Sequence, residues 1–101
     1  MGERWPDTND AGLLVLISLA GGPKHGHAML LDVERFAGVR LGPGTLYGAL
    51  SRLDAAGEIE PLASDSRRRP YQLTDRGRAT LERRLAGLRR TVDTGVARVR
   101  A

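Results

Sequence analysis

The sequence of 101 residues contains no cysteine and no long apolar run. Without cysteine there is no disulfide framework and no thiolate metal site, which fits a reducing cytoplasm. The longest apolar stretch, residues 13–19, is interrupted by a serine and is far shorter than the about eighteen residues that a membrane span needs. The first residues lack the apolar core of a signal peptide. We therefore expect one small cytoplasmic domain that does not enter a membrane.

Sequence patterns of enzymes and of cofactor sites are also missing. There is no nucleophile elbow and no Ser/His/Asp order. His25 and His27 have no obvious third metal ligand, so packing in a loop or at a helix start is the better interpretation. The glycine-rich residues 42–45 lack the lysine of a phosphate-binding P-loop. We predict no catalytic residue, no cofactor and no bound metal.

Positive charge is what the sequence has in excess. The 16 basic residues exceed the 12 acidic ones, giving a net charge of +4, and all but one of the basic residues are arginine. Arginine carries a planar fork that suits phosphate groups and guanine edges. The net charge alone decides little, because arginine-rich usage can reflect a GC-rich genome. Its clustering in Arg67, Arg68 and Arg69 is what indicates an anionic partner.

The first expected helix, residues 10–20, is apolar on nearly every side, unlike the striped helix of a protein surface. It must be covered all round, and a domain of this size offers little cover. We therefore expect a second subunit to pack on it, with Leu13 and Leu16 in the interface. A second helix is expected over residues 26–36, with Phe36 near its apolar face, and a very short strand at Val39 and Leu41.

A third helix is expected over residues 43–56, with Leu46, Leu50 and Leu53 in one narrow arc at helical spacing. The opposite arc is small and polar, so the backbone can approach a DNA groove while the side chains at its margins reach phosphates or base edges. This arc predicts the DNA-binding residues Gly44, Thr45, Tyr47, Gly48, Ser51 and Arg52.

Two strands, residues 59–63 and 70–73, are expected next, joined by a loop that ends in Arg67, Arg68 and Arg69. Pro61 and Pro70 suit the edges of an isolated two-stranded ribbon. Three successive cations on a protruding loop repel one another unless an anion is close. We predict that these arginines contact the DNA backbone or minor groove.

The last expected helix starts at residue 75, after a capping Thr74, and runs to about residue 98. Its apolar residues recur by threes and fours, a pattern typical of helix pairing between subunits. The predicted dimerisation residues of this helix are Leu81, Leu85, Leu88, Val92 and Val96. We thus divide the chain into a polar arm (1–9), a winged helix-turn-helix domain (10–74) and a C-terminal dimerisation helix (75–101).

Three motifs resemble those of the PadR family of bacterial transcriptional regulators. They are His25-Gly26, then Gly44-Thr45-Leu46-Tyr47 with Leu50, Arg52-Leu53 and Gly57-Glu58-Ile59, and finally Arg69-x-Tyr71-x-Leu73-Thr74-x-x-Gly77. The resemblance implies a mostly helical winged helix-turn-helix with a small β-hairpin and a C-terminal dimerisation helix. It also implies a repressor that a small-molecule effector at the dimer interface can release from DNA.

From sequence we therefore expect a homodimeric, sequence-specific regulator that binds a pseudo-palindromic operator in double-stranded DNA. The alternative is a winged-helix protein-interaction module, in which the arginine-rich wing binds an acidic partner rather than DNA.

Overall fold

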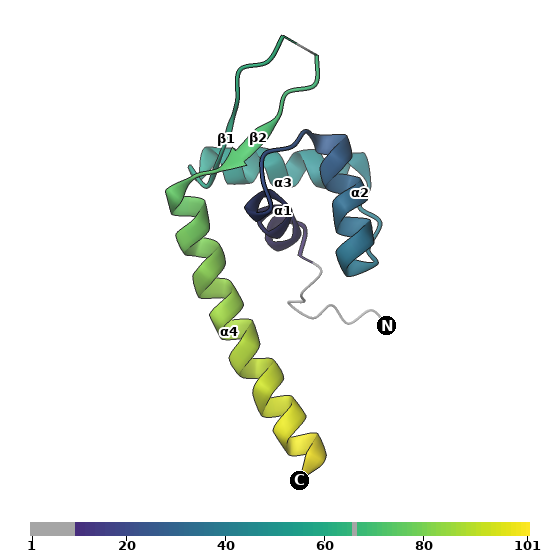
Figure 1. Ribbon diagram of the computed structural model, residues 1–101, viewed down its shortest axis with the longest axis vertical. Coiled ribbons are helices and arrows are strands. Elements are labelled where there is room, and N and C mark those ends of the chain that lie inside the picture. The colour runs from purple at the N-terminus through teal and green to yellow at the C-terminus, as the bar shows by residue number, and fades with distance from the viewer. Residues whose placement is uncertain (1–9, 66) are drawn as a thin grey trace.

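A computed structural model describes residues 10–65 and 67–101 of the chain. The elements are α1 (Ala11–Ala20), α2 (Gly26–Ala37), α3 (Pro43–Ala55), β1 (Ile59–Pro61), β2 (Tyr71–Leu73) and α4 (Asp75–Arg100). Figure 1 shows α1 at the centre, α2 and α3 beside it, the β1–β2 hairpin protruding, and α4 running away from the body as a long rod. The fold class expected from sequence, a winged helix-turn-helix followed by a C-terminal helix, is confirmed. The predicted polar arm lies outside the described residues.

Helix boundaries follow from capping side chains and from glycine. Asp10 caps α1, since its Oδ1 accepts hydrogen bonds from the N–H groups of Gly12 (2.7 Å) and Leu13 (3.2 Å). Thr74 caps α4 by accepting from the Gly77 N–H at 3.0 Å. Gly38, with φ of 68°, ends α2 in the left-handed conformation that glycine adopts without strain.

Helix α1 is the centre of the hydrophobic core, and one chain covers it on all sides. It packs against α2, α3, α4 and β2. Leu13 and Leu16 are 2% and 0% exposed. The expectation that a second subunit must cover these residues is wrong, because four elements of the same chain already exclude water from them.

Two further expectations about local structure also fail. Phe36 is 44% exposed rather than packed on the apolar face of α2. Val39 and Leu41 form no strand, although Leu41 is buried with Leu14 and Val33 in a small core cluster. The side chain of Leu41 is thus anchored by packing, and its backbone has no neighbouring strand to pair with.

Lys24 adds a third chain segment to the wing. Beyond the antiparallel β1–β2 pair, Lys24 exchanges backbone hydrogen bonds with Tyr71 of β2, at 3.2 and 3.1 Å. The Lys24 ammonium donates to the carbonyl oxygens of Ser18 and Gly22 at the end of α1 and lies 3.9 Å from the Asp32 carboxylate of α2. One residue therefore ties the three parts together, the wing through its backbone and α1 and α2 through its side chain.

The first half of α4 is anchored to the body and the second half is not. Leu81 is buried in the core, and Leu88 packs against its edge. Thr80 donates a hydrogen bond of 2.9 Å to the Glu58 carboxylate, beside the wing. From residue 89 onward every side chain of α4 is exposed. Across the described ranges, no helix combines the length and apolar character needed to cross a membrane.

Candidate nucleic-acid interface

The front of α3, the arc predicted to meet DNA, lies on the molecular surface. Thr45, Tyr47, Ser51 and Arg52 are exposed, and Tyr47 retains 59% of its accessible area. The rear of the same helix is buried, with 0–8% exposure, through Leu46, Ala49, Leu50 and Leu53. Because the rear holds the helix on the core, its front is free to be presented to a ligand.

The two glycines on the front of α3 are not required by packing. A Cβ built on Gly44 would meet no atom within 4 Å, and a Cβ on Gly48 would meet only the far end of the Arg52 side chain, at 3.4 Å. Neither residue has the positive φ that demands glycine. The glycines keep the centre of the front low, which suits close approach to a groove.

The wing presents its arginines on an exposed loop. Arg67, Arg68 and Arg69 are all exposed and follow one another between β1 and β2. The hairpin is extended past the strands by a 2.8 Å hydrogen bond from the Leu62 N–H to the Pro70 carbonyl oxygen. In Figure 1 this loop stands well beyond the helical body.

A hollow of about 260 Å³ connects the wing to the start of α2 and to α3. It is lined by His25, Gly26, His27, Tyr47, Arg67, Arg68, Arg69 and Tyr71. The structure thus brings Tyr47 together with the three wing arginines, whereas Arg52 does not line the hollow. The sequence interpretation assigned no binding role to His25, His27 or Tyr71. The one sequence signal was that His25-Gly26 precedes the helix next to α3.

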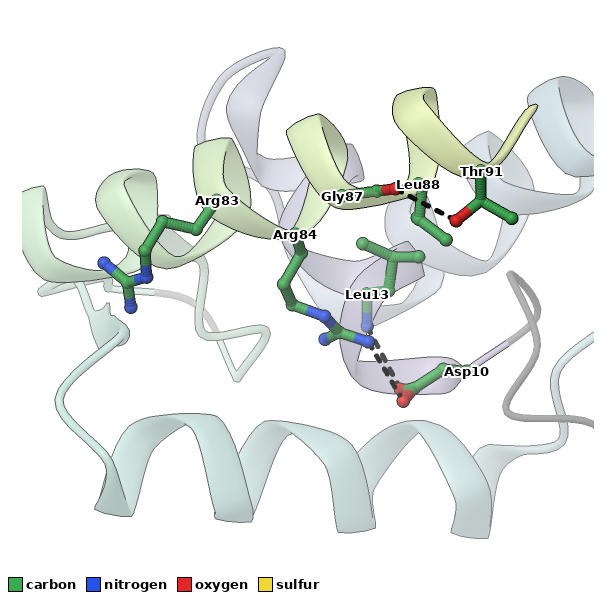
Figure 2. A pocket seen from close by; sticks show the side chains of 7 residues that line it. All are labelled: Asp10, Leu13, Arg83, Arg84, Gly87, Leu88 and Thr91. Atoms are coloured by element: carbon green, nitrogen blue, oxygen red, sulfur yellow. Dashed lines mark hydrogen bonds and ion pairs between the residues drawn. The ribbon is translucent and has the colours of Figure 1, made fainter. Parts of the chain in front are cut away.

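A second hollow, of about 340 Å³, lies between the start of α1 and the middle of α4. Figure 2 shows Leu13 and Leu88 facing it from the two helices, with Arg84 reaching across to Asp10. The Arg84 guanidinium is 3.2 Å from the Asp10 carboxylate. The site is therefore part apolar and part charged.

The Asp10 carboxyl is held in its charged form. Burial alone raises its pKa, but the Leu13 N–H, the charge of Arg84 and the Gly12 N–H lower it by more. The pKa of Asp10 therefore lies below its ordinary value of 3.8. The same carboxylate caps α1 and fixes α4 to it.

Exposed apolar side chains run along α4 from Leu85, near its middle, to its C-terminal end. Leu85, Val92, Val96 and Val99 are 41%, 57%, 42% and 86% exposed. Leu85, Val92 and Val96 are among the residues predicted from sequence to form the dimer, whereas Leu81, which was predicted with them, is buried in the core of its own chain. Among residues 10–65 and 67–101 no group of three or more His, Cys, Asp or Glu is placed to hold a metal ion.

Comparison with protein families gives one family for most of the chain. The family model described as the transcriptional regulator PadR-like family matches residues 13–83. Among solved structures, a PadR family transcription regulator from hypervirulent Clostridium difficile superposes with a TM-score of 0.75 at 25% identity. That match covers 83% of this chain and 92% of the other.

Two curated relatives are longer proteins. The chain is 54% identical over 76 residues to an uncharacterized 37.1 kDa protein in transposon TN4556 of Streptomyces fradiae, covering 75% of this chain and 22% of that protein. It is 39% identical over 66 residues to the transcriptional activator GvpE2 of Halobacterium salinarum, covering 65% and 33%. The chain therefore spans a third or less of the length of these relatives.

Proposed function

Because the chain belongs to the PadR-like family of transcriptional regulators, we propose that it binds double-stranded DNA sequence-specifically as a homodimer and represses transcription. The family resemblance read from sequence is confirmed, and members of this family are regulators rather than enzymes. One observation carries the proposal: the exposed, glycine-lined front of α3 stands beside a wing that presents Arg67, Arg68 and Arg69.

The role that we propose for each element in DNA binding follows from the placement of these residues. Gly44 and Gly48 let α3 enter the major groove, while Thr45, Tyr47, Ser51 and Arg52 contact phosphates or base edges. The wing arginines contact the backbone of the same duplex. Residues 10–74 form the DNA-binding domain, and residues 75–101 the dimerisation helix. Two copies read a pseudo-palindromic operator, with half-sites about one duplex turn apart. We also propose that the protein acts in the cytoplasm, in the same compartment as the DNA that it binds.

Dimerisation is assigned to α4. The assignment is supported by a row of apolar side chains on a part of α4 that the rest of the chain leaves exposed. Leu85, Val92 and Val96 are the central contacts, and Leu88 extends them to the body. Leu13 and Leu16 act only indirectly, as the core on which α4 rests.

We further propose that a small-molecule effector binds near the dimer interface, in the hollow between α1 and α4 (Figure 2). Its volume of about 340 Å³ falls within the usual range of small-molecule pockets, roughly 300–1,000 Å³. The partly exposed apolar side chain of Leu88, with Arg84 beside it, suits a small molecule that carries both an apolar body and a polar group.

The test begins with selection of a duplex from a random pool by the purified protein. Fluorescence anisotropy then compares that duplex with a scrambled one at two salt concentrations. We expect the selected duplex to bind about a thousandfold more tightly. Tyr47→Ala and Arg52→Ala should weaken that preference, while Arg100→Ala, at the far end of α4, should leave it intact.

Equal and steeply salt-sensitive binding to both duplexes would sink the proposal, since it reflects phosphate attraction alone. It would favour the alternative, a wing that binds an acidic protein partner. Transcription in vitro from a promoter containing the selected duplex decides the direction of control. A fall on adding the protein supports repression, and a rise would place it with activators, as GvpE2 is named.

A further inference from the structure

The hollow between the wing, α2 and α3 concentrates positive charge. Three arginines and two histidines line it together with two tyrosines. None of the described residues in its lining carries a carboxyl group. Lys24, just before α2, and Asp32, within α2, interact with each other at the end of α1 and are not part of the lining. The chemistry of the hollow is therefore that of an anion site.

The size and position of the hollow restrict the kind of anion that it can bind. A volume of about 260 Å³ lies below the roughly 300–1,000 Å³ of pockets that enclose a small molecule. Tyr47 reaches it from the front of α3, and the hydroxyl oxygen of Tyr47 would be only 3.1 Å from a Cβ on Gly26 of α2. Arg67 and Arg69 reach it from the wing. A DNA strand held by both α3 and the wing must run past this hollow.

We propose that the hollow binds one phosphodiester group of the DNA backbone and that His27 is a direct contact to that phosphate. The inference rests on the proposed function and adds to it a site that joins the recognition helix and the wing through α2. His25, the other histidine, instead caps α2, because its Nδ1 accepts the Ala28 N–H at 3.4 Å. His27 is exposed and faces the wing arginines and both tyrosines across the hollow.

A histidine contact makes DNA binding proton-linked. Histidine ordinarily changes charge near pH 6.5, and an adjacent phosphate favours the protonated form. Binding of DNA therefore takes up a proton, so affinity falls as pH rises. Protonated His27 also neutralises one more phosphate, which steepens the salt dependence of binding by about 0.9 in the log–log slope. That increment is present in acid and absent in alkali.

The experiment measures anisotropy with a mixed-sequence duplex of about two helical turns. Wild type, His27→Gln and His25→Asn are compared at about pH 6 and about pH 8, at constant ionic strength and over a salt series. In wild type we expect binding to be roughly fivefold tighter at the lower pH, as a one-unit rise in a histidine pKa produces. His27→Gln should abolish this ratio and lower the salt slope only at the lower pH.

His25→Asn is the matched control, because asparagine also caps helices and the chain has only two histidines. It should keep the pH ratio of wild type. Equal pH ratios in wild type and His27→Gln would overturn the inference, as would loss of the ratio in His25→Asn alone. A purely structural role of His27 would lower affinity equally at both pH values, with no change in the salt slope.

A second arm separates the source of the phosphate. The His27 ring signals are followed by NMR while either inorganic phosphate or the duplex is added to wild type. A shift with the duplex at concentrations where inorganic phosphate has no effect supports a DNA contact. A shift with inorganic phosphate alone overturns it. If no duplex were selected from the random pool, the proposed sequence-specific regulator would be contradicted. The test of His27 would remain valid, because it uses a mixed-sequence duplex.

Discussion

Gly77 is the glycine with the least room for a side chain in the described structure. A Cβ at this position would lie 1.9 Å from the carbonyl oxygen of Glu58, a backbone atom that cannot rotate away. The contact is where α4 leaves the wing and turns onto the core. Gly77 therefore sets how closely the C-terminal helix approaches the DNA-binding domain.

Gly77→Ala should lower the free energy of unfolding by about 3 kcal/mol, because the helix or the wing must move to relieve the clash. Urea unfolding at one fixed protein concentration measures it. Gly87→Ala is the control in the same helix. A Cβ there meets only the end of the Arg90 side chain at 3.8 Å, so the variant should be unchanged or stabler by up to about 1 kcal/mol. A Gly77→Ala variant as stable as wild type would contradict the packing argument.

Asp10 links pH to stability through its depressed pKa. A carboxyl whose pKa is lower folded than unfolded adds stability above the unfolded value and loses it as pH falls through the folded value. For Asp10 that loss occurs below 3.8, its ordinary value. The contribution is small, since the side chains of the Asp10–Arg84 pair are 47% and 38% exposed and solvent screens them.

Asp10→Asn keeps a capping oxygen and removes the charge. We expect it to lower the free energy of unfolding by about 0.5 kcal/mol at neutral pH. Thermal or urea unfolding should find this difference constant down to about pH 5 and shrinking below about pH 4. The double variant with Arg84→Gln should show little additional loss. A difference that grew in acid would mean that the carboxylate is not the stabilised form.

At the scale of the element, the glycines of α3 lower the stability of the helix but keep its exposed front free of side chains. Gly48 lies within the helix at a position that alanine can occupy. Gly48→Ala should therefore raise the free energy of unfolding by about 0.5–1 kcal/mol. The same methyl group stands on the front of α3, where we expect it to weaken binding of the selected duplex about tenfold, or ~1.4 kcal/mol. Urea unfolding and DNA-binding anisotropy, measured on the same preparation, test whether stability rises while affinity falls.

Gly87→Ala again serves as the comparison, because it adds a methyl group to a helix away from the front of α3. It should leave DNA affinity unchanged. If Gly48→Ala bound DNA as well as wild type, α3 would not approach its ligand closely along this face.

The elements were predictable wherever a local signal determined them. Asp10 and Thr74 cap helix starts with their side chains, and Gly38 caps the end of α2 with a positive φ. Gly57, also at positive φ, directly follows the C-cap of α3. The strand expected at Val39 and Leu41 failed because strand formation needs a partner, and β2, already paired with β1, takes its additional bridge from Lys24 instead. No sequence pattern announces a bridge between residues so far apart in the chain.

At the scale of the whole molecule, we propose that the C-terminal half of α4 carries the dimer contact. Val92→Arg with Val96→Arg places two charges in the exposed apolar row, so sedimentation should show monomers for this variant, whereas we expect dimers for wild type. Specific DNA affinity should fall with it, because two half-sites are no longer read together.

Ala86→Arg with Ala97→Arg adds the same charge to α4 outside the apolar row, where both alanines are exposed. This control should remain dimeric. A dimer that survives the valine changes would place the interface elsewhere on the molecule.

The candidate interface was only partly predictable, because some of the residues that meet in it are far apart in the sequence. The front of α3 could be read from helical spacing, since Leu46, Leu50 and Leu53 define the rear. The hollow that joins Tyr47 to His27 and the wing could not, because its residues come from three separate segments. Likewise the cover of α1 was misjudged, as composition does not reveal that one chain can surround a helix on four sides.

Lys24 is the only lysine in the chain, and its ammonium is occupied between the end of α1 and Asp32 of α2. Amine-directed reagents, from fluorescent esters to formaldehyde, will thus find a single lysine here, and one whose modification removes the charge that joins α1 to α2 next to the wing. Experiments that map DNA occupancy by cross-linking through lysine would therefore underestimate how much of this protein is bound to DNA. Labels are better introduced at an engineered cysteine on the outer face of α4, in a chain that has no other thiol.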